Sequence, residues 1–515
     1  MNRLFAFSRW LHKYMGLALL LFLSWMSLSG VLMNHPDLIS GLSVPGWLVP
    51  PQYRVENWNR NSLIDLEYSS VDTQVAFAAG KQGVWKSVDG GTDFVSFQEG
   101  LPQSTYYRKT RDLLLWEQGA PLLFAGTDGG LYVCDLRTEK WRAVDLGSGH
   151  HPIKKIFAVQ DQLFVATASG LFSSPAPPAA LVFTSVSMPR EAEGRRVSLI
   201  EAFFTLHSGE AWRLAGRLLF DAVGLVLIFL CISAFYTWYF PWQRRHRARV
   251  DLRNNPNSAK MFKSLFKNHL KLGIWVAAVL LIIGGTGFFM RPPLLALIAN
   301  GSLAAGAYPG FLSDNPWHER IHNAMYDSVS EQILVQASDG LWRTDAALTQ
   351  PFERFVRDVP IFVMGATVFE PYDEDGQLVG SFSGLFHWQR HNAQSIDLIT
   401  NEAVSGPATL RPGDHMITSY FRTPEGEEFV ATFEQGIVAV GDARRNGRFQ
   451  VPQTLTAEFS MPMWNYLFEI HNGRFFKDLV GGLYILTIPL GSLLLLLITL
   501  SGIYDWLFLK IRRRG

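Results

Sequence analysis

Residues 12–36 read HKYMGLALLLFLSWMSLSGVLMNHP, and residues 269–293 read HLKLGIWVAAVLLIIGGTGFFMRPP. The two stretches agree without a gap at His12 and His269, Gly16 and Gly273, Gly30 and Gly287, Met33 and Met290, and Pro36 and Pro293. Similarity at a fixed offset indicates an internal repeat. Each stretch also approaches the ~20 apolar residues that cross a bilayer. The repeat therefore predicts a duplicated membrane helix.

A second pair of apolar segments repeats in the same way. Residues 206–209 read LHSG and residues 470–473 read IHNG, while SAFYTW at 233–238 matches SGIYDW at 501–506. Four spans are expected, at Met15–Met33, Leu218–Phe240, Leu272–Met290 and Leu479–Leu509. The predicted fold class is a four-span α-helical membrane bundle of two duplicated helix pairs, together with an all-β region outside the membrane.

Basic residues mark the cytoplasmic side of this bundle. They precede the first span, lie between the second and third, and end the chain: Arg3, Arg9, Lys13; Arg244, Arg245, Arg247, Arg249, Arg253, Lys260, Lys263, Lys267; Lys510, Arg512, Arg513, Arg514. Both termini are therefore expected in the cytoplasm of a bacterial cell, with the protein in the inner membrane. The predicted divisions are the N-terminus with the first span (1–35), a periplasmic β region (36–200), the second span (201–243), a basic loop (244–267), the third span (268–292), a second periplasmic β region (293–463), and the fourth span with a basic tail (464–515).

Charge and cysteine content restrict the function. The formal net charge is +1, with basic residues in short runs beside apolar segments, so the lipid bilayer is an expected partner and nucleic acid is not. Cys134 and Cys231, the only cysteines, lie in different kinds of segment, which makes a disulfide improbable. Because no CxxCH motif is present, any haem is expected to be held non-covalently.

The predicted topology sorts four histidines into two levels. His12 and His269 fall on the cytoplasmic side of the first and third spans, and His207 and His471 fall on the outer side of the second and fourth. Each level thus holds one histidine from each half, an arrangement that suits bis-histidine ligation of haem. The alternative is that these histidines only anchor helix ends at the membrane interface. His35, which ends the first span, is a candidate substitute ligand.

These motifs resemble the PepSY-associated transmembrane family, through His12-x-x-x-Gly16, residues 206–209, residues 470–474 and the tryptophans Trp238 and Trp506. The family includes bacterial inner-membrane ferrisiderophore reductases with four spans. The resemblance implies two haem b groups, with His12, His269, His207 and His471 as iron ligands. It also implies the reduction of a periplasmic ferric siderophore or another iron chelate. Arg213, Arg217 and Arg474 are candidates for binding the haem propionates or an anionic chelate.

The β regions contain a recurring turn. It appears as Gly83-Val84-Trp85, Gly130-Leu131-Tyr132, Gly170-Leu171-Phe172, Gly340-Leu341-Trp342, Gly384-Leu385-Phe386 and Gly436-Ile437-Val438, at spacings of about 40 to 52 residues. That spacing is the length of a propeller blade. Ser87-x-Asp89-x-Gly91-x-x-Phe94 resembles an Asp-box hairpin. We expect one six-bladed propeller-like cap built from both halves, since two separate three-unit domains would leave exposed sheet edges.

Several alternatives remain open on the sequence alone. No GxGxxG motif lies between a strand and a helix, so the electron donor is expected to be a separate cytoplasmic protein or a quinol. The chain also fits a non-enzymatic anchored propeller that binds a partner, or a sensor of iron or redox state. A single occupied haem level is another alternative. His318 and His322 would share a helix face if residues 317–327 were helical, although no third metal ligand is evident.

Overall fold

The computed structural model describes residues 3–512, except residues 148, 178–179, 191–195, 248–255, 300, 356–360, 391–394, 405–412, 442–446 and 458. Arg249, Arg253, Arg513 and Arg514 of the expected basic segments lie outside the described residues. The chain divides into two compact units, each built from both halves of the sequence. One unit comprises residues 1–39, 194–312 and 464–515, and the other comprises residues 40–193 and 313–463.

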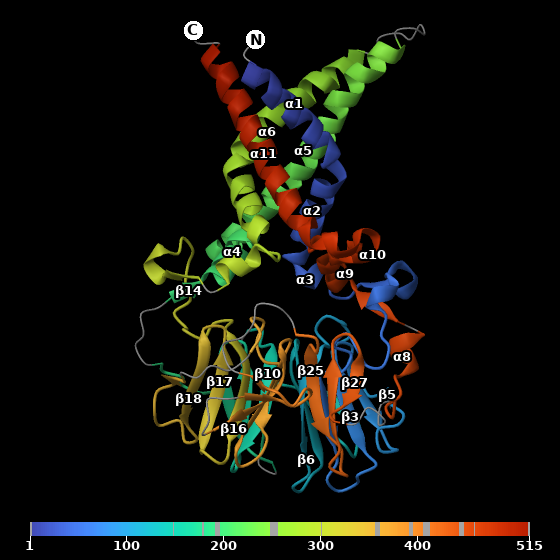
Figure 1. Cartoon of the computed structure of the whole chain (residues 1–515), viewed down its shortest axis with the longest axis vertical. Coiled ribbons are helices and arrows are strands. Elements are labelled where there is room, and N and C mark those ends of the chain that lie inside the picture. The colour runs from blue at the N-terminus through green and yellow to red at the C-terminus, as the bar shows by residue number, and fades with distance from the viewer. Residues whose placement is uncertain are drawn as a thin grey trace. The chain divides into compact units, whose positions relative to one another are not determined.

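The first unit is helical (Figure 1). Its main helices are α1 (Arg3–Ala18), α2 (Leu20–Met33), α5 (Arg213–Arg247), α6 (Pro256–Phe289) and α11 (Thr487–Arg512). Its shorter helices are α3 (Pro36–Ile39), α4 (Leu199–Ser208), α7 (Leu295–Ile298), α9 (Met463–His471) and α10 (Lys477–Val480). Among the described residues, three helical stretches are long and apolar enough to cross a membrane, or up to four if α1 and α2 form one span.

The first expected span is not a straight helix. It breaks at Leu19, and α1 and α2 are bent by 63° relative to each other. Gly16, a weak helix former, lies three residues before the break. The helix contacts are α2 with α5, α5 with α6, α6 with α11, and α11 with α1, so the helices surround a common centre.

A separate short helix precedes each of the second and fourth spans. The helix that carries His207 ends at Gly209, which has φ +81°, and α5 starts only at Arg213. Likewise, α9 ends at His471, Gly473 has φ +82°, and α-helical structure resumes fully at Thr487. A glycine in the left-handed region is a common helix terminator, because it pays no Cβ penalty there. The expected divisions 201–243 and 464–515 therefore each begin with a separate short helix, which carries His207 in the first and His471 in the second.

The second unit is built of antiparallel sheets. The first half contributes β2 (Asp65–Tyr68), β3 (Ala76–Gly80), β4 (Gly83–Ser87), β5 (Val95–Ser96); β6 (Thr110–Trp116), β7 (Leu122–Thr127), β8 (Gly130–Asp135), β9 (Lys140–Val144); β10 (Ile153–Val159), β11 (Gln162–Thr167), β12 (Leu171–Pro175), β13 (Thr184–Ser185). The second half contributes β16 (Ile321–Asp327), β17 (Gln332–Ala337), β18 (Gly340–Asp345), β19 (Glu353–Arg354); β20 (Val368–Pro371), β21 (Gly376–Ser381), β22 (Gly384–Gln389), β23 (Ser395–Asp397), β24 (Ala403–Val404); β25 (Ile417–Arg422), β26 (Glu428–Thr432), β27 (Gly436–Ala439).

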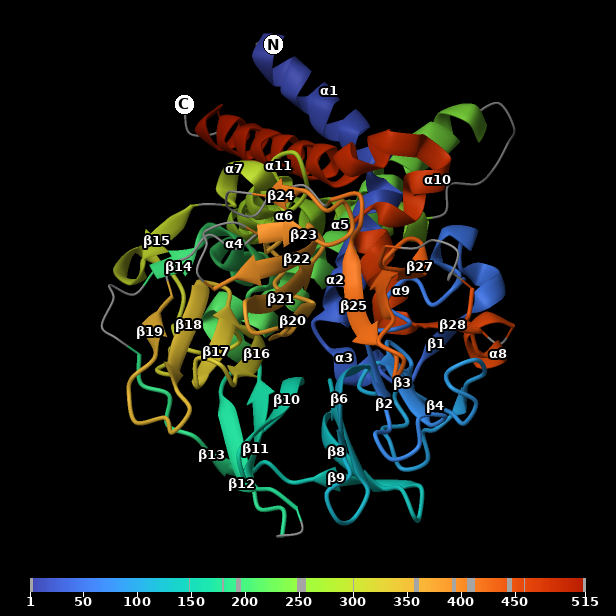
Figure 2. The same cartoon turned by 60° about the horizontal axis from the view of Figure 1, so that its bottom comes forward.

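The first strands of these sheets form a closed ring. Contacts run from β2 to β6, β10, β16, β20 and β25, and from β25 back to β2 (Figure 2). This arrangement is β-propeller-like, with consecutive sheets of three to five strands drawn from both halves. The recurring glycine turns lie at or just before the third strand of each sheet, as the spacing predicted. Gly83, Gly130 and Gly340 have φ between +122° and +132°, which explains why glycine recurs there.

Two shorter pairings also join the halves. In the helical unit, β14 (Arg196–Ser198) pairs with β15 (Ser302–Ala304), and in the β unit, β1 (Ser43–Pro45) pairs with β28 (Ser460–Pro462). The Asp-box between β4 and β5 is formed, because the Gly91 amide donates to the Ser87 hydroxyl and the Asp93 amide donates to the Asp89 carboxylate. The remaining short helix is α8 (Gln453–Thr456).

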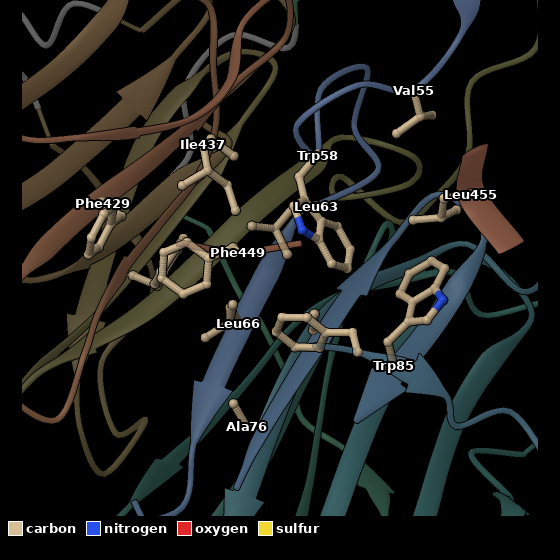
Figure 3. Close-up of a cluster of buried hydrophobic side chains, with 14 of the residues drawn as sticks. Val55, Trp58, Leu63, Leu66, Ala76, Trp85, Phe429, Ile437, Phe449 and Leu455 are labelled. Carbon is tan, nitrogen blue, oxygen red and sulfur yellow. The ribbon is translucent and has the colours of Figure 1, made fainter. Parts of the chain in front are cut away.

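The ring is sealed where its first and last sheets meet. Trp58 is fully buried in an apolar cluster that includes Trp85 from the first sheet and Phe429 and Ile437 from the last (Figure 3). The backbone just before β2 is hydrogen-bonded to the last sheet, since the Ile437 amide donates to the Asn57 carbonyl oxygen at 2.9 Å. Asn57 and Trp58 take positive φ values of 47° and 61° to make this approach. Packing at this seam therefore joins residues almost 400 positions apart.

Candidate functional site

Two histidine pairs lie in the helical unit. The rings of His12, on α1, and His269, on α6, have centroids 6.3 Å apart and planes at 90°. The rings of His207, on α4, and His471, on α9, have centroids 6.4 Å apart and planes at 78°. Each pair takes one histidine from each half of the repeat. The structure thus brings together the two pairs that the sequence grouped by level.

These separations fit one metal ion between two imidazoles. With a metal–nitrogen bond of about 2.0–2.1 Å and a nitrogen about 1.2 Å from its ring centroid, two coaxial imidazole ligands have centroids about 6.4 Å apart. Aromatic rings in direct edge-to-face contact have centroids about 4.5–7 Å apart. Both pairs lie within that range as well as at the separation of two imidazole ligands. The residues present therefore fit a bis-histidine haem at either level.

Every one of the four rings is held through its Nδ1 atom. His269 Nδ1 lies 2.8 Å from the Ser233 hydroxyl, and His471 Nδ1 lies 2.8 Å from the Ser29 hydroxyl. The same atom of His12 lies 3.0 Å from the carbonyl oxygen of Ile498 and 3.2 Å from the Ser501 hydroxyl. A hydrogen bond to one ring nitrogen sets the orientation of the ring and leaves the other nitrogen for a metal.

The fourth ring follows the same pattern. His207 Nδ1 lies 3.2 Å from the Ile283 carbonyl oxygen and 3.1 Å from the Thr286 hydroxyl. Ser29 and Thr286 occupy equivalent positions in the repeat of residues 12–36 and 269–293. Ser233 and Ser501 are likewise equivalent in the second repeat. Each half therefore orients the histidines of the other half, and these hydroxyl residues are positioning groups that the sequence comparison did not single out.

Glycines provide the space around the outer pair. A Cβ atom on Gly287 would lie 3.1 Å from His207 Cε1, and one on Gly30 would lie 3.5 Å from His471 Cε1. At the inner level, a Cβ on Gly502 would lie 3.1 Å from His12 Cε1. Gly16 has no neighbour within 4 Å of an added Cβ, so open space remains one turn from His12.

Burial keeps the outer histidines neutral. It lowers the pKa of His207 to about 4. Burial, together with electrostatic repulsion from His207, lowers the pKa of His471 to about 3. Both side chains lie on short helices that end before the spans begin. A neutral imidazole is the form that binds a metal ion. The outer pair is therefore in the ligating protonation state at neutral pH.

The structure shortens the distance between the two levels. His269 and Ile283, whose carbonyl oxygen His207 contacts, are both on α6 and are fourteen residues apart, which corresponds to about 21 Å along a helix. A straight helix through His207 would have placed the outer level further from the inner one. The break at Gly209 instead allows α4 to pack beside α6.

His35 has a different partner. Its Nε2 lies 2.7 Å from the Asp221 carboxylate, and the Asn34 amide donates to the same carboxylate at 2.8 Å. Asp221 lies on α5 and its side chain is only 9% exposed. The nitrogen that would have served as a substitute ligand therefore binds a carboxylate in this structure.

The three predicted arginines differ in their surroundings. Arg474 Nη2 donates to Glu469 at 2.6 Å, while the Arg213 side chain is exposed and its guanidinium lies 5.6 Å from the Phe311 ring centroid. Arg217 Nε is buried and has no hydrogen-bond partner among the described residues. Arg291 Nε is also buried without a hydrogen-bond partner among the described residues. Burial and repulsion from nearby Arg474 lower the pKa of Arg291.

Buried guanidinium nitrogens without acceptors fit an anionic group such as a haem propionate. Arg291, four residues after Gly287, is not marked by the repeat, because the equivalent position in the first half is Asn34. His318 and His322 do not share a helix face, because His322 lies in strand β16. No cluster of three or more His, Cys, Asp or Glu side chains within the described residues could hold a metal ion by itself.

Comparison with solved structures shows weak likeness to large extracellular domains. The chain is 12% identical to the extracellular domain of the hybrid two-component system BT4673 from B. thetaiotaomicron, covering 72% of this chain and 32% of that one, with a TM-score of 0.31. It is 8% identical to PorZ of the type-IX secretion system of Porphyromonas gingivalis, covering 73% and 30%, with a TM-score of 0.32. The chain thus spans about a third of the length of these proteins.

A smaller protein is similar over most of its own length. YCF48 from Cyanidioschyzon merolae is 10% identical, with 77% of this chain and 96% of that chain covered and a TM-score of 0.31. No curated protein matches the sequence. The family comparison is far more extensive, because the PepSY-associated TM region matches residues 9–510. The chain is a membrane protein that belongs to the PepSY-associated TM region family.

Proposed function

We propose that the protein is a haem b-containing oxidoreductase of the bacterial inner membrane that passes electrons outward to reduce a periplasmic ferric chelate, such as a ferric siderophore. The observation that carries the proposal is the pair of facing imidazoles at each of two levels, with Nδ1 of every ring engaged. Haem b, when bound, supplies one-electron chemistry.

The protein's own residues support this use in two ways. The hydroxyl and carbonyl groups from the opposite half orient the four rings, so metal binding would join the two halves. The buried Nε atoms of Arg217 and Arg291 would hold the acidic edge of a cofactor at the outer side. The positive residues beside the spans favour cytoplasmic termini, and we propose a quinol or a cytoplasmic protein as the electron donor.

Electron transfer to iron is tested by stopped-flow mixing. Purified protein is reduced with dithionite, freed of excess reductant, and mixed with a ferric siderophore or ferric citrate under argon. We expect the haem absorption spectrum to return to that of the oxidised form. A ferrous-specific chelator should report an amount of Fe²⁺ equal to the amount of haem oxidised. Haem that stays reduced with every ferric chelate would instead favour the sensor or partner-binding function.

The space beside His207 gives a second test. Gly287→Ala places a Cβ 3.1 Å from His207 Cε1 and 2.9 Å from the Ser492 hydroxyl, so the ring must move. We expect the outer haem potential to change by on the order of 60 mV, about a tenfold change in a one-electron equilibrium. Potentiometric titration with optical detection measures it.

Gly285→Ala is the matched control on the same helix. An added Cβ at Gly285 meets nothing within 4 Å, so both potentials should remain at the wild-type values. Equal shifts in the two variants would show that the effect comes from the helix and not from contact with His207.

A further inference from the structure

The centre of the β unit contains a cavity of about 230 Å³. It is lined by the first strands of the sheets and by the residues that precede them. Typical drug-sized ligand pockets are about 300–1,000 Å³, so this cavity suits a smaller molecule. It lies wholly within the second unit and does not involve the histidine pairs.

Four of the first strands carry a β-bulge at the same place. The pairing registers shift between Thr110 and Asp112, Ile153 and Lys155, Ile321 and Asn323, and Ile417 and Ser419. The extra residues are Arg111, Lys154, His322 and Thr418, and all four line the cavity. A bulge interrupts the alternation of side chains and can redirect one toward a site.

Arg111, Lys154 and His322 come from consecutive sheets. Burial lowers the pKa of His322 to about 4, so its neutral ring can donate one hydrogen bond near pH 7. Lys109, just before β6, adds a further ammonium group to the same wall. Among the described residues, neither Lys109 nor Lys154 forms a side-chain hydrogen bond or ion pair. Asp128 binds Arg111, with 2.5 Å between Nε and Oδ1, and the carboxylates of Asp128 and Glu319 also attract Lys154. Repulsion from Arg111 and burial lower the pKa of Lys109 to about 7, and burial lowers that of Lys154 to about 8.

The acidic residues of the cavity form a separate group with its own partners. Asp112 accepts from Lys155 Nζ at 2.6 Å and from the Ile156 amide at 2.6 Å. Asp65 accepts from the Leu113 amide at 2.6 Å. Burial raises the pKa values of Asp112 and Glu370 to about 7, which reduces their negative charge near neutral pH. These carboxylates therefore do not neutralise Lys109 and Lys154.

We propose that Lys109, Arg111, Lys154 and His322 form a binding site for a small oxyanion with at least two negative charges, carried on phosphate or carboxylate oxygens. Such an anion supplies the acceptors that the two ammonium groups lack. The volume accommodates a molecule of about the size of phosphate or citrate. The site does not depend on the proposed electron transfer, since its ligand contacts no haem-binding residue.

The test is calorimetric titration of the full chain in detergent, at pH 7 and 0.15 M salt, with inorganic phosphate and with citrate as separate probes. We expect at least one probe to bind the wild type with one-to-one stoichiometry. The double variant Lys109→Gln with Lys154→Gln should weaken that binding by about tenfold or more. Binding of phosphate alone identifies a phosphate-bearing ligand, and binding of citrate alone identifies a carboxylate-bearing one.

Lys140→Gln is the control, because Lys140 lies in an exposed ion pair with Glu99 and is absent from the cavity lining. It should bind as the wild type does. The single variant Lys154→Gln provides the same comparison if the double variant does not fold. Absence of binding of both probes to the wild type would overturn the proposal, as would unchanged affinity in the cavity variants or equal weakening in Lys140→Gln.

Discussion

His207→Ala and His471→Ala are each expected to reduce the haem content of the purified protein from two haems per chain to one. His12→Ala and His269→Ala should each remove the other haem. The reason is geometric, because under the proposed function each haem iron would lie between two rings whose centroids are 6.3 or 6.4 Å apart, and one imidazole alone would leave an open coordination position. The pyridine haemochrome assay, divided by protein concentration, gives the count.

The combination of variants makes this result specific. The double variant His207→Ala with His471→Ala should retain one haem, whereas His12→Ala with His207→Ala should retain none. His318→Ala is the control, because His318 is an exposed residue of the β unit and should leave two haems. Colourless wild-type protein from haem-replete cells would contradict the proposal, and one haem in the wild type would mean that a single level is occupied.

Trp58→Ala should destabilise the β unit by about 3–5 kcal/mol, the usual loss for a large buried aromatic residue. Trp58 is fully buried and packs edge to face against Trp85 and Phe94, with ring centroids 5.6 and 5.1 Å away. Its indole nitrogen also donates to the Gln450 carbonyl oxygen. Truncation would leave a cavity at the seam between the first and last sheets. Calorimetric unfolding of the full chain in detergent measures the loss.

Trp47→Ala separates this effect from the general loss of an aromatic side chain. Trp47 is in the same unit, but its side chain is 79% exposed. Its replacement should change the free energy of unfolding by less than about 0.5 kcal/mol. Similar values for the two variants would mean that the seam contributes little to the stability of the ring.

Much of the architecture could be predicted because its signals are local. The length of the apolar segments predicted the spans. The recurring glycine turns predicted the sheets, because a glycine with φ near +122° is required where β4 begins. The pairing of His12 with His269 could be expected from the repeat, because a pseudo-twofold axis can bring equivalent positions of two copies to face each other around a shared centre. The breaks at Leu19, Gly209 and Gly473 were not predicted. Helix breaks of this kind depend on packing as well as on propensity.

Fewer details of the site could be predicted from the sequence. Ser29 and Thr286 contact histidines that are 442 and 79 residues away in the chain, and a search for matching motifs does not show such contacts. Arg291 has no equivalent arginine in the first half. The basic wall of the cavity was missed for a different reason, because a β-bulge moves a side chain from one face of a strand to the other without leaving a clear mark in the sequence.

The sequence by itself determined that this protein has duplicated membrane helices, two levels of histidines and repeated β units. These properties depend on apolar length, offset and turn chemistry, which short segments carry alone. Only the tertiary structure decided that His207 and His471 lie on separate short helices, that His35 binds Asp221, and that Lys109 and Lys154 share a cavity. The direction of a side chain depends on local backbone breaks and on contacts between distant residues, and both are settled only when the chain packs.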